Sequence, residues 1–507
     1  MIWNILAGAF MEEVPVMNKI ELKDIEPEKC FVVEGESKIL ESYAAYLTDE
    51  SRVECQAVSA IYFPENTAQV VDAVQRTRDR GERIVVSASR TGVAGGAAGV
   101  EDASIISLER MTARLGDWHF QAGVKLEDMQ STQSEYYPVD PTEMTASLGG
   151  TVATDASGAR TYHYGSTRDF IEALTIVLAD GRVLKIRRGD TVCEDGEFVL
   201  RHGYEEIIVP VVGVRMPRVR NTAGLYLKED MDLVDLFVGS EGTLGIITEV
   251  ETGAARLPED RLFLIVYAGT EDQALGLVEA VKADVRLNCL AIEYLGPNAV
   301  ALLRDNETFP NLPGDVGCAV YLEILMENED VEVAIDEALI SCGLNVDGTW
   351  AGLGEKDLHE MKRFRHMVPE TVNAIIGRRK KDIHGLHKIG TDTAVPEGRL
   401  REFISFARSA IEKEGLEYVV FGHIGDNHLH INMLPRSLEE LEKAEGLHHR
   451  VAEESVRLGG TVSAEHGVGR LKKHLLEIQF SEDELKAMKA VKKALDPEGV
   501  LNPGVIF

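Results

Sequence analysis

Hydrophobic residues recur along this chain with two different periods, and the changes of period mark its elements. Residues 61–63, 84–86 and 104–108 are short apolar runs of the kind found in strands. Between the first two runs, residues 67–80 have the apolar spacing of an amphipathic helix. A glycine-rich loop separates the second and third strands, so residues 61–110 are predicted to form an α+β unit.

A different pattern covers residues 140–253, where short β-branched runs alternate with glycine turns. Strands are predicted there at 173–178, 182–186, 236–238 and 246–250. Beyond residue 256 the pattern changes again, and Pro258-Glu259-Asp260 is the best candidate for a domain boundary.

The rest of the chain predicts a second α+β region. Helical periodicity covers 272–283, 331–341, 397–414 and 438–458, and strand-like runs lie at 263–267 and 319–324. At 507 residues the chain is too long for one hydrophobic core. We therefore expect a leader and helical segment over 1–50 and two larger domains over 51–258 and 259–507.

Composition and charge narrow the class of protein. The hydrophobic fraction of 44% and the charged fraction of 27% are typical of folded globular proteins. Asp and Glu outnumber Lys and Arg by 85 to 53, and the resulting formal charge of −32 disfavours nucleic acid and anionic lipid as partners. Any anionic ligand must therefore be held by a local group of cations.

Cysteine usage and the N-terminal residues bear on the location of the protein. The six cysteines are scattered and form no C-x-x-C pair, which predicts neither a disulfide framework nor a cysteine metal site. Residues 2–10 are apolar, but this run is short and lacks the basic start of a secretory signal. No run reaches the roughly 20 apolar residues of a membrane span. We expect a cytoplasmic protein with no transmembrane segment and a frayed leader.

The glycine loop, SASRTGVAGGA at 87–97, follows the second predicted strand. Its glycines let backbone N–H groups turn toward an anion without obstruction from a Cβ, which suits a pyrophosphate. The loop matches neither G-x-G-x-x-G nor G-x-x-x-x-G-K-[ST], so a Rossmann site or a P-loop is not indicated. Taken alone, a mobile surface loop explains it equally well.

Two histidines flank a predicted turn in the last quarter of the chain. Residues 418–421 and 429–433 are strand-like, and a hairpin between them brings His423 near His430. Because side chains alternate along a strand, His430 and Asn432 share one face.

A carboxylate with a neighbouring histidine follows in GGTVSAEHGVG at 459–469, where Glu465 precedes His466. Two imidazoles and one carboxylate are a common ligand set for a divalent zinc, manganese or iron ion with open positions. A single histidine of this kind is more often a satisfied polar side chain. The metal prediction therefore depends on His423, His430 and Glu465 together.

Several ordered segments carry a resemblance to a known family: DPT at 140–142, LGGTVATDASG at 148–158, YGSTRD at 164–169 and GSEGTLGIIT at 239–248. With the glycine loop they resemble the FAD-binding domain of the FAD-linked oxidase family, in the vanillyl-alcohol oxidase or PCMH-type superfamily. The histidine segments are similar to that family's motifs G-H-x-G-D-x-x-x-H and S-x-E-H-G-x-G, in the branch of D-lactate, D-2-hydroxyglutarate and glycolate dehydrogenases. The resemblance covers residues 55–507.

This resemblance implies an α+β fold with three parts. They are a PCMH-type FAD-binding domain of two subdomains over 51–258, an α+β (ferredoxin-like) substrate cap domain within 259–507, and a C-terminal helical segment that returns to the flavin domain. FAD is expected to be noncovalent, because the glycine loop contains no histidine. The cofactor residues implied are Arg90, Thr91, Gly92, Gly95, Gly96, Pro141, Thr142, Ser147, Gly149, Gly150, Asp155, Gly158, Ile246, Ile247 and Asn502.

The resemblance also implies roles in the second domain. It makes His423, His430 and Glu465 the metal ligands and His466 the general base, and it assigns Arg365, Lys388 and Asn432 to the substrate. Asp155, Asn427 and His428 stand where many members carry Asn, Gly and Asn. His428 is either an additional ligand or a turn residue, and we favour the turn residue.

These features predict an FAD-dependent dehydrogenase that oxidises a small D-2-hydroxy acid of the D-lactate, glycolate or D-2-hydroxyglutarate type. A metal lowers the pKa of the hydroxyl, His466 accepts its proton, and flavin N5 accepts the hydride. A separate acceptor then takes the electrons: an electron-transfer flavoprotein, an iron–sulfur subunit, a quinone or a cytochrome. Contact with a membrane through that acceptor and a homodimeric state both stay open.

Three alternatives are weighed against this prediction. A non-redox flavoprotein of the alkylglycerone phosphate synthase type is disfavoured by the pair His423 and His430. A noncatalytic flavin electron-transfer subunit would need neither a metal nor His466. A metal-dependent hydrolase without flavin would be excluded by a flavin absorption spectrum.

Overall fold

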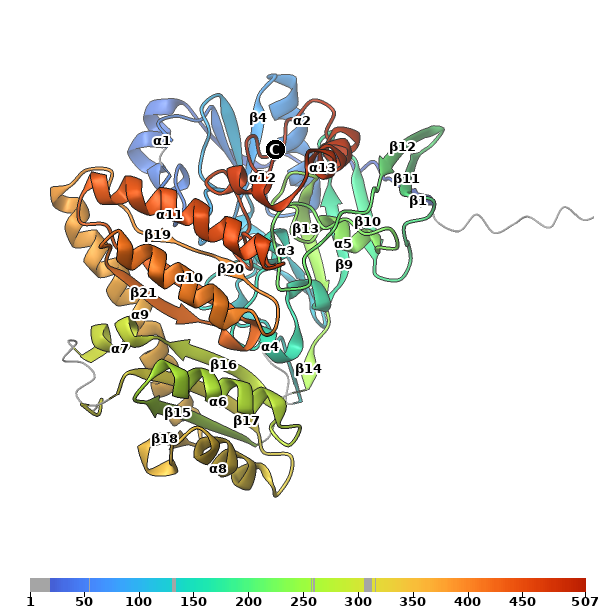
Figure 1. The fold of residues 1–507 in the computed structure, drawn as a ribbon. Coiled ribbons are helices and arrows are strands. Elements are labelled where there is room, and N and C mark those ends of the chain that lie inside the picture. The colour runs from blue at the N-terminus through green and yellow to red at the C-terminus, as the bar shows by residue number, and fades with distance from the viewer. Residues whose placement is uncertain are drawn as a thin grey trace, which may run out of the picture.

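The computed structural model describes residues 19–53, 55–129, 134–256, 258, 260–304, 312–314 and 316–507. The expected N-terminal leader lies largely outside these residues, as does Glu259 of the expected boundary. Figure 1 shows an upper part that contains the first half of the chain and its last helices, and a lower part built from β15 to β18 with α6 and α8.

The first sheet holds the glycine loop. Its strand order is β2-β3-β5-β4, with β3, β5 and β4 parallel. The strands are β2 (Phe31–Glu34), β3 (Ala60–Phe63), β4 (Arg83–Ser87) and β5 (Ala103–Ser107). The predicted helix at 67–80 is confirmed as α2 (Thr67–Asp79), which begins where the Asn66 side chain accepts a hydrogen bond from the Gln69 N–H. The loop therefore starts at the carboxyl end of a parallel strand.

The second sheet is antiparallel, with strand order β10-β9-β13-β7-β6. Its strands are β6 (Arg114–Gly116), β7 (His119–Gln121), β9 (Ile171–Val177), β10 (Val183–Arg187) and β13 (Ile246–Thr252). The prediction of a strand at 236–238 is wrong, because these residues form the end and the C-cap of the short helix α5 (Leu233–Phe237). Asp232 caps this helix by accepting a hydrogen bond from the Val234 N–H, and a short buried apolar run carries no period that separates helix from strand.

Smaller elements complete this half of the chain. They are the strands β1 (Lys19–Glu21), β8 (Glu135–Tyr136), β11 (Glu197–His202), β12 (Glu205–Pro210) and β14 (Ala255–Arg256), and the helices α1 (Glu36–Ser42), α3 (Leu148–Thr154) and α4 (Thr161–Tyr164). Leu148 and Val152 of α3 join the same core as the second sheet. The segment 145–158 is thereby held against this core.

The third sheet is antiparallel and carries the histidine hairpin. Its order is β18-β15-β17-β16-β21-β22-β19, and β20 pairs with β22. The strands are β15 (Arg261–Ala268), β16 (Cys289–Leu295), β17 (Cys318–Leu325), β18 (Thr349–Gly352), β19 (Ile389–Gly390), β20 (Thr393–Ala394), β21 (Tyr418–Gly422) and β22 (His428–Met433). The order of the first four, in chain order 4-1-3-2 with α6 and α8 as crossovers, is the ferredoxin-like arrangement that was predicted.

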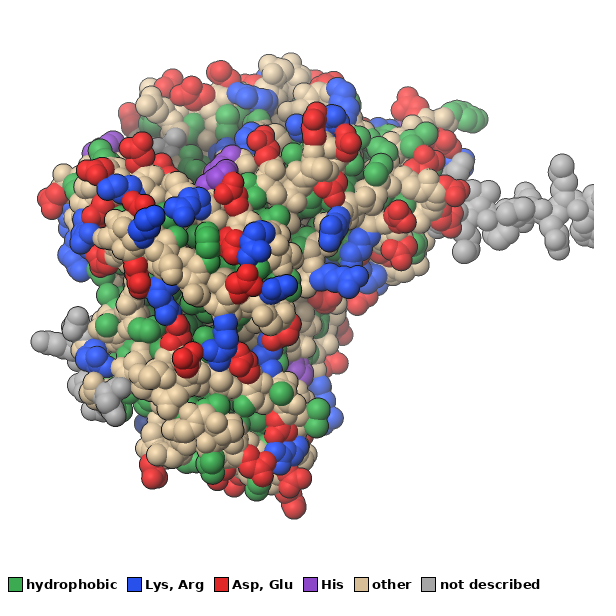
Figure 2. All heavy atoms as spheres, in the orientation of Figure 1, with side chains coloured by type: hydrophobic (Ala, Val, Ile, Leu, Met, Phe, Trp, Pro, Cys, Tyr) green, Lys and Arg blue, Asp and Glu red, His purple; other side chains and the backbone are tan. Residues whose placement is uncertain are grey.

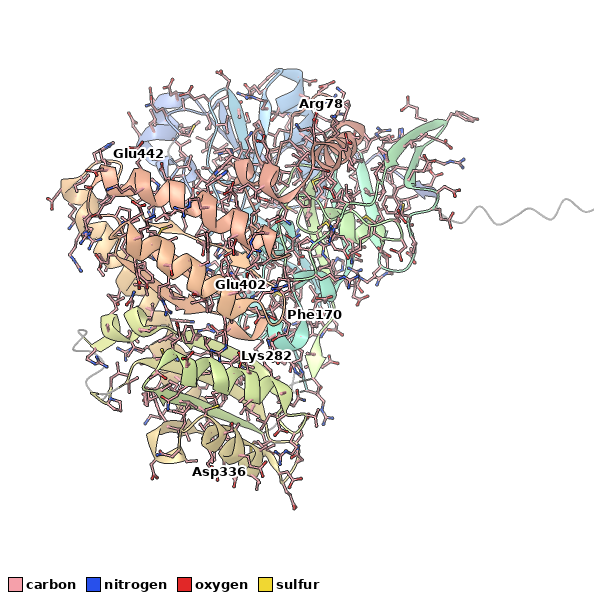
Figure 3. All side chains as sticks on the ribbon, in the orientation of Figure 1. Arg78, Phe170, Lys282, Asp336, Glu402 and Glu442 are labelled. Carbon is pink, nitrogen blue, oxygen red and sulfur yellow. The ribbon has the colours of Figure 1, made fainter. Side chains whose placement is uncertain are left out.

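Helices cover both faces of the third sheet. One face packs against α6 (Glu271–Ala283), α8 (Val331–Ser341), α10 (Leu400–Lys413) and α11 (Leu438–Arg457). The other packs against α7 (Pro297–Arg304) and the long α9 (Glu355–Asp382). The helix predicted from residue 397 starts later, at Leu400, because residues 396–399 form a turn. Lys282 of α6 (Figure 3) donates through Nζ to the Gly425 carbonyl at 2.9 Å, so it ties the lower part to the turn between β21 and β22.

The C-terminal segment returns to the first sheet after α12 (Leu476–Gln479) and α13 (Glu482–Leu495). Leu501 forms a parallel bridge with Ile84 of β4. The Asn502 side chain accepts a hydrogen bond from the Val86 N–H at 2.8 Å and donates to the Glu241 carbonyl at 2.7 Å. Asn502 therefore links β4, the turn at 239–245 and the chain end.

The surface and the helices bear on the class of protein. Acidic and basic side chains are interspersed over the face shown in Figure 2, so the net negative charge is spread rather than gathered there. Among the described residues, no helix is long and apolar enough to cross a membrane.

A buried ion pair joins the two halves of the chain. Arg160, beside α4, donates to Glu323 of β17 through Nη2 at 2.8 Å and Nε at 3.1 Å, and Arg261 contacts the same carboxylate at 3.1 Å. We predict that Glu323→Ala lowers the free energy of unfolding by about 3–5 kcal/mol, because it leaves the buried guanidinium of Arg160 and the half-buried one of Arg261 without this carboxylate. Denaturant unfolding measures the change. The control Glu439→Ala removes an exposed pair with Lys443, and it should change stability by less than about 1 kcal/mol; an equal loss in both variants contradicts the prediction.

Candidate functional site

The histidine hairpin is formed by β21 and β22, with Phe421 opposite His430 in the register. The turn between the strands needs left-handed backbone at Asn427, with φ of 52°. Leu429, Ile431 and Met433 pack into the core beneath α10 and α11, so His428, His430 and Asn432 face the opposite side of the sheet. The predicted hairpin is confirmed, and the rings of His423 and His430 lie 5.9 Å apart.

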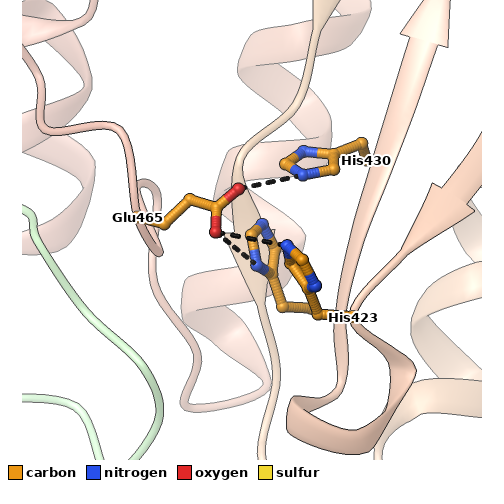
Figure 4. Close-up of side chains that lie close together, drawn as sticks. His423, His430 and Glu465 are labelled. Atoms are coloured by element: carbon orange, nitrogen blue, oxygen red, sulfur yellow. Dashed lines mark ion pairs between the residues drawn. The ribbon is translucent and has the colours of Figure 1, made fainter. Parts of the chain in front are cut away.

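Glu465 lies between these histidines, as Figure 4 shows. Its Oε1 is 3.1 Å from Nε2 of His430, and its Oε2 is 3.4 Å from Nε2 of His423. The carboxylate is buried, and among the described residues Oε2 has ion-pair contacts with His423 and Arg220 but no hydrogen bond. Two ring nitrogens and a carboxylate that converge in this way fit a divalent metal ion.

The outer nitrogens of the two imidazoles are held by acceptors. His423 Nδ1 is 2.6 Å from Oε1 of Glu293 on β16, and His430 Nδ1 is 3.3 Å from the Thr391 carbonyl. Hydrogen bonds on the outer nitrogens fix the ring orientation and direct both Nε2 atoms toward Glu465. This is the second layer of contacts that metal-binding histidines usually have.

Charges in the cluster reinforce one another. Burial opposes ionisation of Glu465, but His423 and Arg220 outweigh it and hold the pKa of this carboxyl well below its usual range. Burial likewise opposes ionisation of Glu293, yet His423 and Arg365 lower its pKa to about 2. Burial would lower the pKa of His423, but Glu293 and Glu465 raise it to about 9. The two carboxylates thus favour a positive charge between them, and a divalent cation can supply that charge in place of the proton.

His466 stands beside the cluster with part of its ring exposed. Its Nε2 lies 3.3 Å from Glu465 Oε1 and its Nδ1 lies 3.5 Å from Asp392 Oδ2, and the ring stacks on His430 at 5.4 Å between centroids. Burial lowers the pKa of His466, against the opposing charge of Asp392. The neutral imidazole is therefore favoured near neutral pH, which suits a proton acceptor.

Asp392 holds the loop that carries both Glu465 and His466. Its carboxylate accepts hydrogen bonds from the backbone N–H groups of these two residues, at 3.2 and 3.1 Å, and from Lys472 Nζ at 2.7 Å. A buried carboxylate between the β19 and β20 strands therefore sets the position of the loop.

The expected substrate residues occupy different surroundings. Arg365 of α9 is half-buried, and its Nη1 lies 3.4 Å from Oε2 of Glu293, the same carboxylate that contacts His423. Asn432 is buried on the histidine face of β22. Lys388 Nζ donates to Asn373 Oδ1 at 2.8 Å, and burial lowers its pKa. Arg365 and Asn432 thus lie close to the histidine cluster. Lys388 instead forms its hydrogen bond with Asn373 of α9, outside the cluster.

Three residues of the site were missed by the sequence analysis: Arg220, Glu293 and Asp392. Arg220 Nη2 lies 3.3 Å from Glu465 Oε2. Glu293 carried a usable signal, because it is a lone acidic residue in the apolar run CLAIEYL. Arg220 lies outside helices and strands and has no distinguishing pattern around it.

Unpaired polar groups gather where the glycine loop starts. Ser87 and Ser107 are opposite each other at the carboxyl ends of β4 and β5, and within the described residues neither buried hydroxyl has a hydrogen-bond partner. The Ser157 hydroxyl is also buried without a partner in the described part of the chain. Gly92 and Gly150, in the two glycine-rich segments, are exposed. Buried polar groups of this kind indicate a polar ligand.

Comparisons with known proteins identify this ligand class. A profile of the FAD binding domain matches residues 58–187, and a profile of the C-terminal domain of FAD linked oxidases matches residues 257–506. The chain belongs to the FAD-linked oxidase family. The family resemblance and the α+β fold predicted from the sequence are thereby confirmed, as is a flavoprotein oxidoreductase.

Relatives of this FAD-linked oxidase span most of the chain. A D-2-hydroxyglutarate dehydrogenase of Stutzerimonas stutzeri is 27% identical over 92% of this chain and 95% of its own length. A D-lactate dehydrogenase of Archaeoglobus fulgidus is 27% identical over 87% and 90%, and the glycolate oxidase subunit GlcD of Bacillus subtilis is 26% identical over 88% of each. A solved alkyldihydroxyacetonephosphate synthase has a TM-score of 0.62 at 15% identity, over 98% of this chain and 90% of its own, and it supports the fold alone.

Several expected flavin contacts of this FAD-linked oxidase are engaged with protein atoms. Arg90 has a left-handed backbone, donates to the Ala88 carbonyl at 2.9 Å and stacks on Tyr46. Asp155 accepts hydrogen bonds from Ser166 Oγ and from Nε of Arg168, at 2.9 and 3.0 Å. Both side chains therefore shape the loops that carry them.

Other expected flavin residues differ in how open they are. Thr142, Gly92 and Gly150 are exposed, Thr91, Pro141 and Gly96 are half-buried, and Gly95, Ser147, Gly149, Gly158, Ile246 and Ile247 are buried. At Gly158 a Cβ would stand 2.2 Å from the Asp140 carbonyl, so only glycine fits. The exposed positions are those at which backbone can meet a ligand.

Glu241 connects the FAD-binding half of the chain to the loop that carries Glu465 and His466. It lies in the GSEGTLG turn, and its carboxylate accepts hydrogen bonds from the Val468 and Gly469 N–H groups, both at 2.8 Å. Burial raises its pKa to about 7, although these two hydrogen bonds oppose the rise. The loop bearing Glu465 and His466 is thus attached directly to the GSEGTLG turn.

Proposed function

We propose that this chain oxidises a D-2-hydroxy acid to the 2-oxo acid, using FAD and a divalent metal. One observation carries the proposal: His423, His430 and Glu465 converge, and the accessible ring of His466 lies against the same carboxylate. Relatives named as dehydrogenases of D-lactate and D-2-hydroxyglutarate support the same substrate class.

His423, His430 and Glu465 would hold the metal ion. A divalent cation there, zinc, manganese or iron, lowers the pKa of a bound hydroxyl and neutralises a carboxylate. Glu293 keeps His423 in the orientation that directs Nε2 inward, through the 2.6 Å contact at Nδ1.

His466 accepts the hydroxyl proton of the substrate. Its neutral state is favoured by burial, and Asp392 beside Nδ1 stabilises the imidazolium that forms. FAD, when bound, accepts the Cα hydrogen as a hydride. The proton and the hydride of the substrate therefore go to different acceptors: the proton to His466 of this chain and the hydride to the cofactor.

Arg365 and Asn432 orient the acid. Burial opposes the charge of Arg365, but Glu293 outweighs it and raises the pKa of the guanidinium, so the group stays cationic. It can attract the substrate carboxylate, and Asn432 can donate to a substrate oxygen. Lys388 would provide a second cation for a larger acid.

FAD would bind in the upper part, between the residues Arg90 to Gly96 of the glycine loop and the segment 141–158. Asn502 would hold the strand from which the glycine loop starts, through its hydrogen bond with Val86. We propose functional domains at 51–258 and 259–507, because the last strand of the second sheet ends at Thr252, the small β14-β8 sheet ends at Arg256, and the third sheet starts at Arg261. Electrons would pass to a separate acceptor: an electron-transfer flavoprotein, an iron–sulfur subunit, a quinone or a cytochrome.

Anaerobic reduction of the flavin by a panel of acids tests the proposal. We expect the D enantiomer of a 2-hydroxy acid to bleach the flavin absorption, its L enantiomer to leave it unchanged, and the same sample to contain about one divalent metal per chain. If no 2-hydroxy acid bleaches the flavin, the proposed substrate class is wrong.

A further inference from the structure

His428 is the least exposed residue of the histidine cluster. Its side chain is fully buried at the start of β22, on the same sheet face as His430. Its ring lies 4.6 Å from that of His430 and 5.5 Å from that of His423, between centroids. This position does not fit the turn residue favoured from the sequence, because the turn has already ended at Asn427.

One nitrogen of the ring faces the cluster and the other faces away. His428 Nδ1 is 4.0 Å from Glu465 Oε2, and Nε2 is 3.3 Å from Asp392 Oδ1. With its proton on Nε2, toward Asp392, the ring presents the Nδ1 lone pair to Glu465. His423 and His430 also have an acceptor behind the ring, at hydrogen-bond distance. The contact of His428 with Asp392 is an ion pair without hydrogen-bond geometry among the described residues, and Nδ1 of His428 also faces Arg220.

The separations suit one shared ion. Imidazole and carboxylate atoms that bind the same metal at about 2.0–2.2 Å are at most about 4.2 Å apart. The contacts of His430, His423 and His428 with Glu465 are 3.1, 3.4 and 4.0 Å. When one atom is taken from each of the four side chains, every pair lies within 4.8 Å, so binding one ion would require the set to close by up to about 0.6 Å.

From this geometry we infer that His428 is a third imidazole ligand, so that the metal centre of this chain has three histidines and one glutamate. This inference rests on the metal site of the proposed function. A six-coordinate ion keeps two positions beside four protein ligands, enough for the carboxylate and hydroxyl oxygens of a 2-hydroxy acid. A tetrahedral zinc ion keeps none, and the nitrogen-rich set favours iron(II), cobalt or nickel over manganese.

Arg220 defines the competing role for His428. Its Nη1 lies 3.5 Å from His428 Nδ1 and its Nη2 lies 3.3 Å from Glu465 Oε2. If Nδ1 serves only as an acceptor for this guanidinium, the metal has two histidine ligands and His428 is structural. Measuring the metal affinity of a His428 variant distinguishes the ligand role from the structural role.

The variant His428→Gln keeps a donor near Asp392 and removes the Nδ1 ligand. Full-length protein is stripped with a chelator and titrated with Co²⁺, followed by visible absorption and by metal content. We expect the dissociation constant for Co²⁺ to rise at least about tenfold and the cobalt spectrum to change, with FAD content and the melting temperature of the metal-free protein unchanged. The control His449→Gln, at an exposed site on α11, should match the wild type.

A second measurement needs no substitution. Electron paramagnetic resonance of the wild-type protein with Cu²⁺ counts the coupled imidazole nitrogens, and we expect three. Two coupled nitrogens, or Co²⁺ binding in His428→Gln equal to that of the wild type, would overturn the inference and leave the two-histidine site intact. Failure of the wild type to bind any metal would instead remove the metal site of the proposed function.

Discussion

Flavin reduction in His466→Ala should be about 10²–10⁴-fold slower than in the wild type, with FAD and metal retained. The variant removes the proton acceptor, whereas His423, His430 and Glu465 stay in place. The ring of His466 is partly exposed, so its loss leaves a site that water can fill rather than a cavity in the core. Stopped-flow absorbance under anaerobic conditions measures the rate, and metal analysis verifies the ion.

Two controls distinguish a base from a structural residue. His449→Ala removes an exposed histidine and should leave the rate unchanged. Asp392→Asn removes the charge beside Nδ1, and an intermediate rate is expected because the imidazolium loses its counterion. Unchanged flavin reduction in His466→Ala would exclude His466 as the base, and loss of metal would make it a ligand instead.

The hairpin was predictable because its information is local. The strand pattern on either side of a short turn fixes the register, and the register brings His423 and His430 together. The alternation of side chains then places His430 and Asn432 on one face. The ferredoxin-like sheet followed from the family resemblance rather than from any pattern in its strands.

The second layer of the site was not predictable in this way. Glu293 and Asp392 reach the histidines from β16 and from the segment between β19 and β20, which are far from the hairpin in the sequence. Their roles depend on strand order in the third sheet, and strand order is a tertiary property. A lone carboxylate in an apolar strand indicates a buried partner, but the sequence does not identify that partner.

The helix α9 was missed for a different reason. Pro369 lies in its interior, and proline removes a backbone hydrogen bond and usually ends or kinks a helix. The apolar residues of α9, among them Phe364 and Val368, are nonetheless buried against the third sheet. Tertiary packing therefore outweighs the cost of the proline, and Arg365 is held on this helix next to Glu293.

Glu465→Gln should lose the metal and, with it, rapid flavin reduction. Loss of an outer contact typically weakens metal binding about 10–100-fold, so loss of a direct carboxylate ligand should exceed about 100-fold. Without the ion the substrate hydroxyl keeps its high pKa, and we expect flavin reduction to slow by about 10³-fold or more. Glutamine preserves the size of the side chain, so the buried cluster stays filled.

The comparison with His466→Ala makes this second prediction specific. Excess metal should partly restore the rate of flavin reduction in Glu465→Gln, because the imidazoles of His423 and His430 remain. It should not restore the rate in His466→Ala, because that variant lacks the proton acceptor. The control Glu439→Gln, at an exposed position on α11, should bind metal like the wild type. Stoichiometric metal in Glu465→Gln would show that the carboxylate is not a ligand, and Oε2 would then serve only its ion pairs with Arg220 and the histidines.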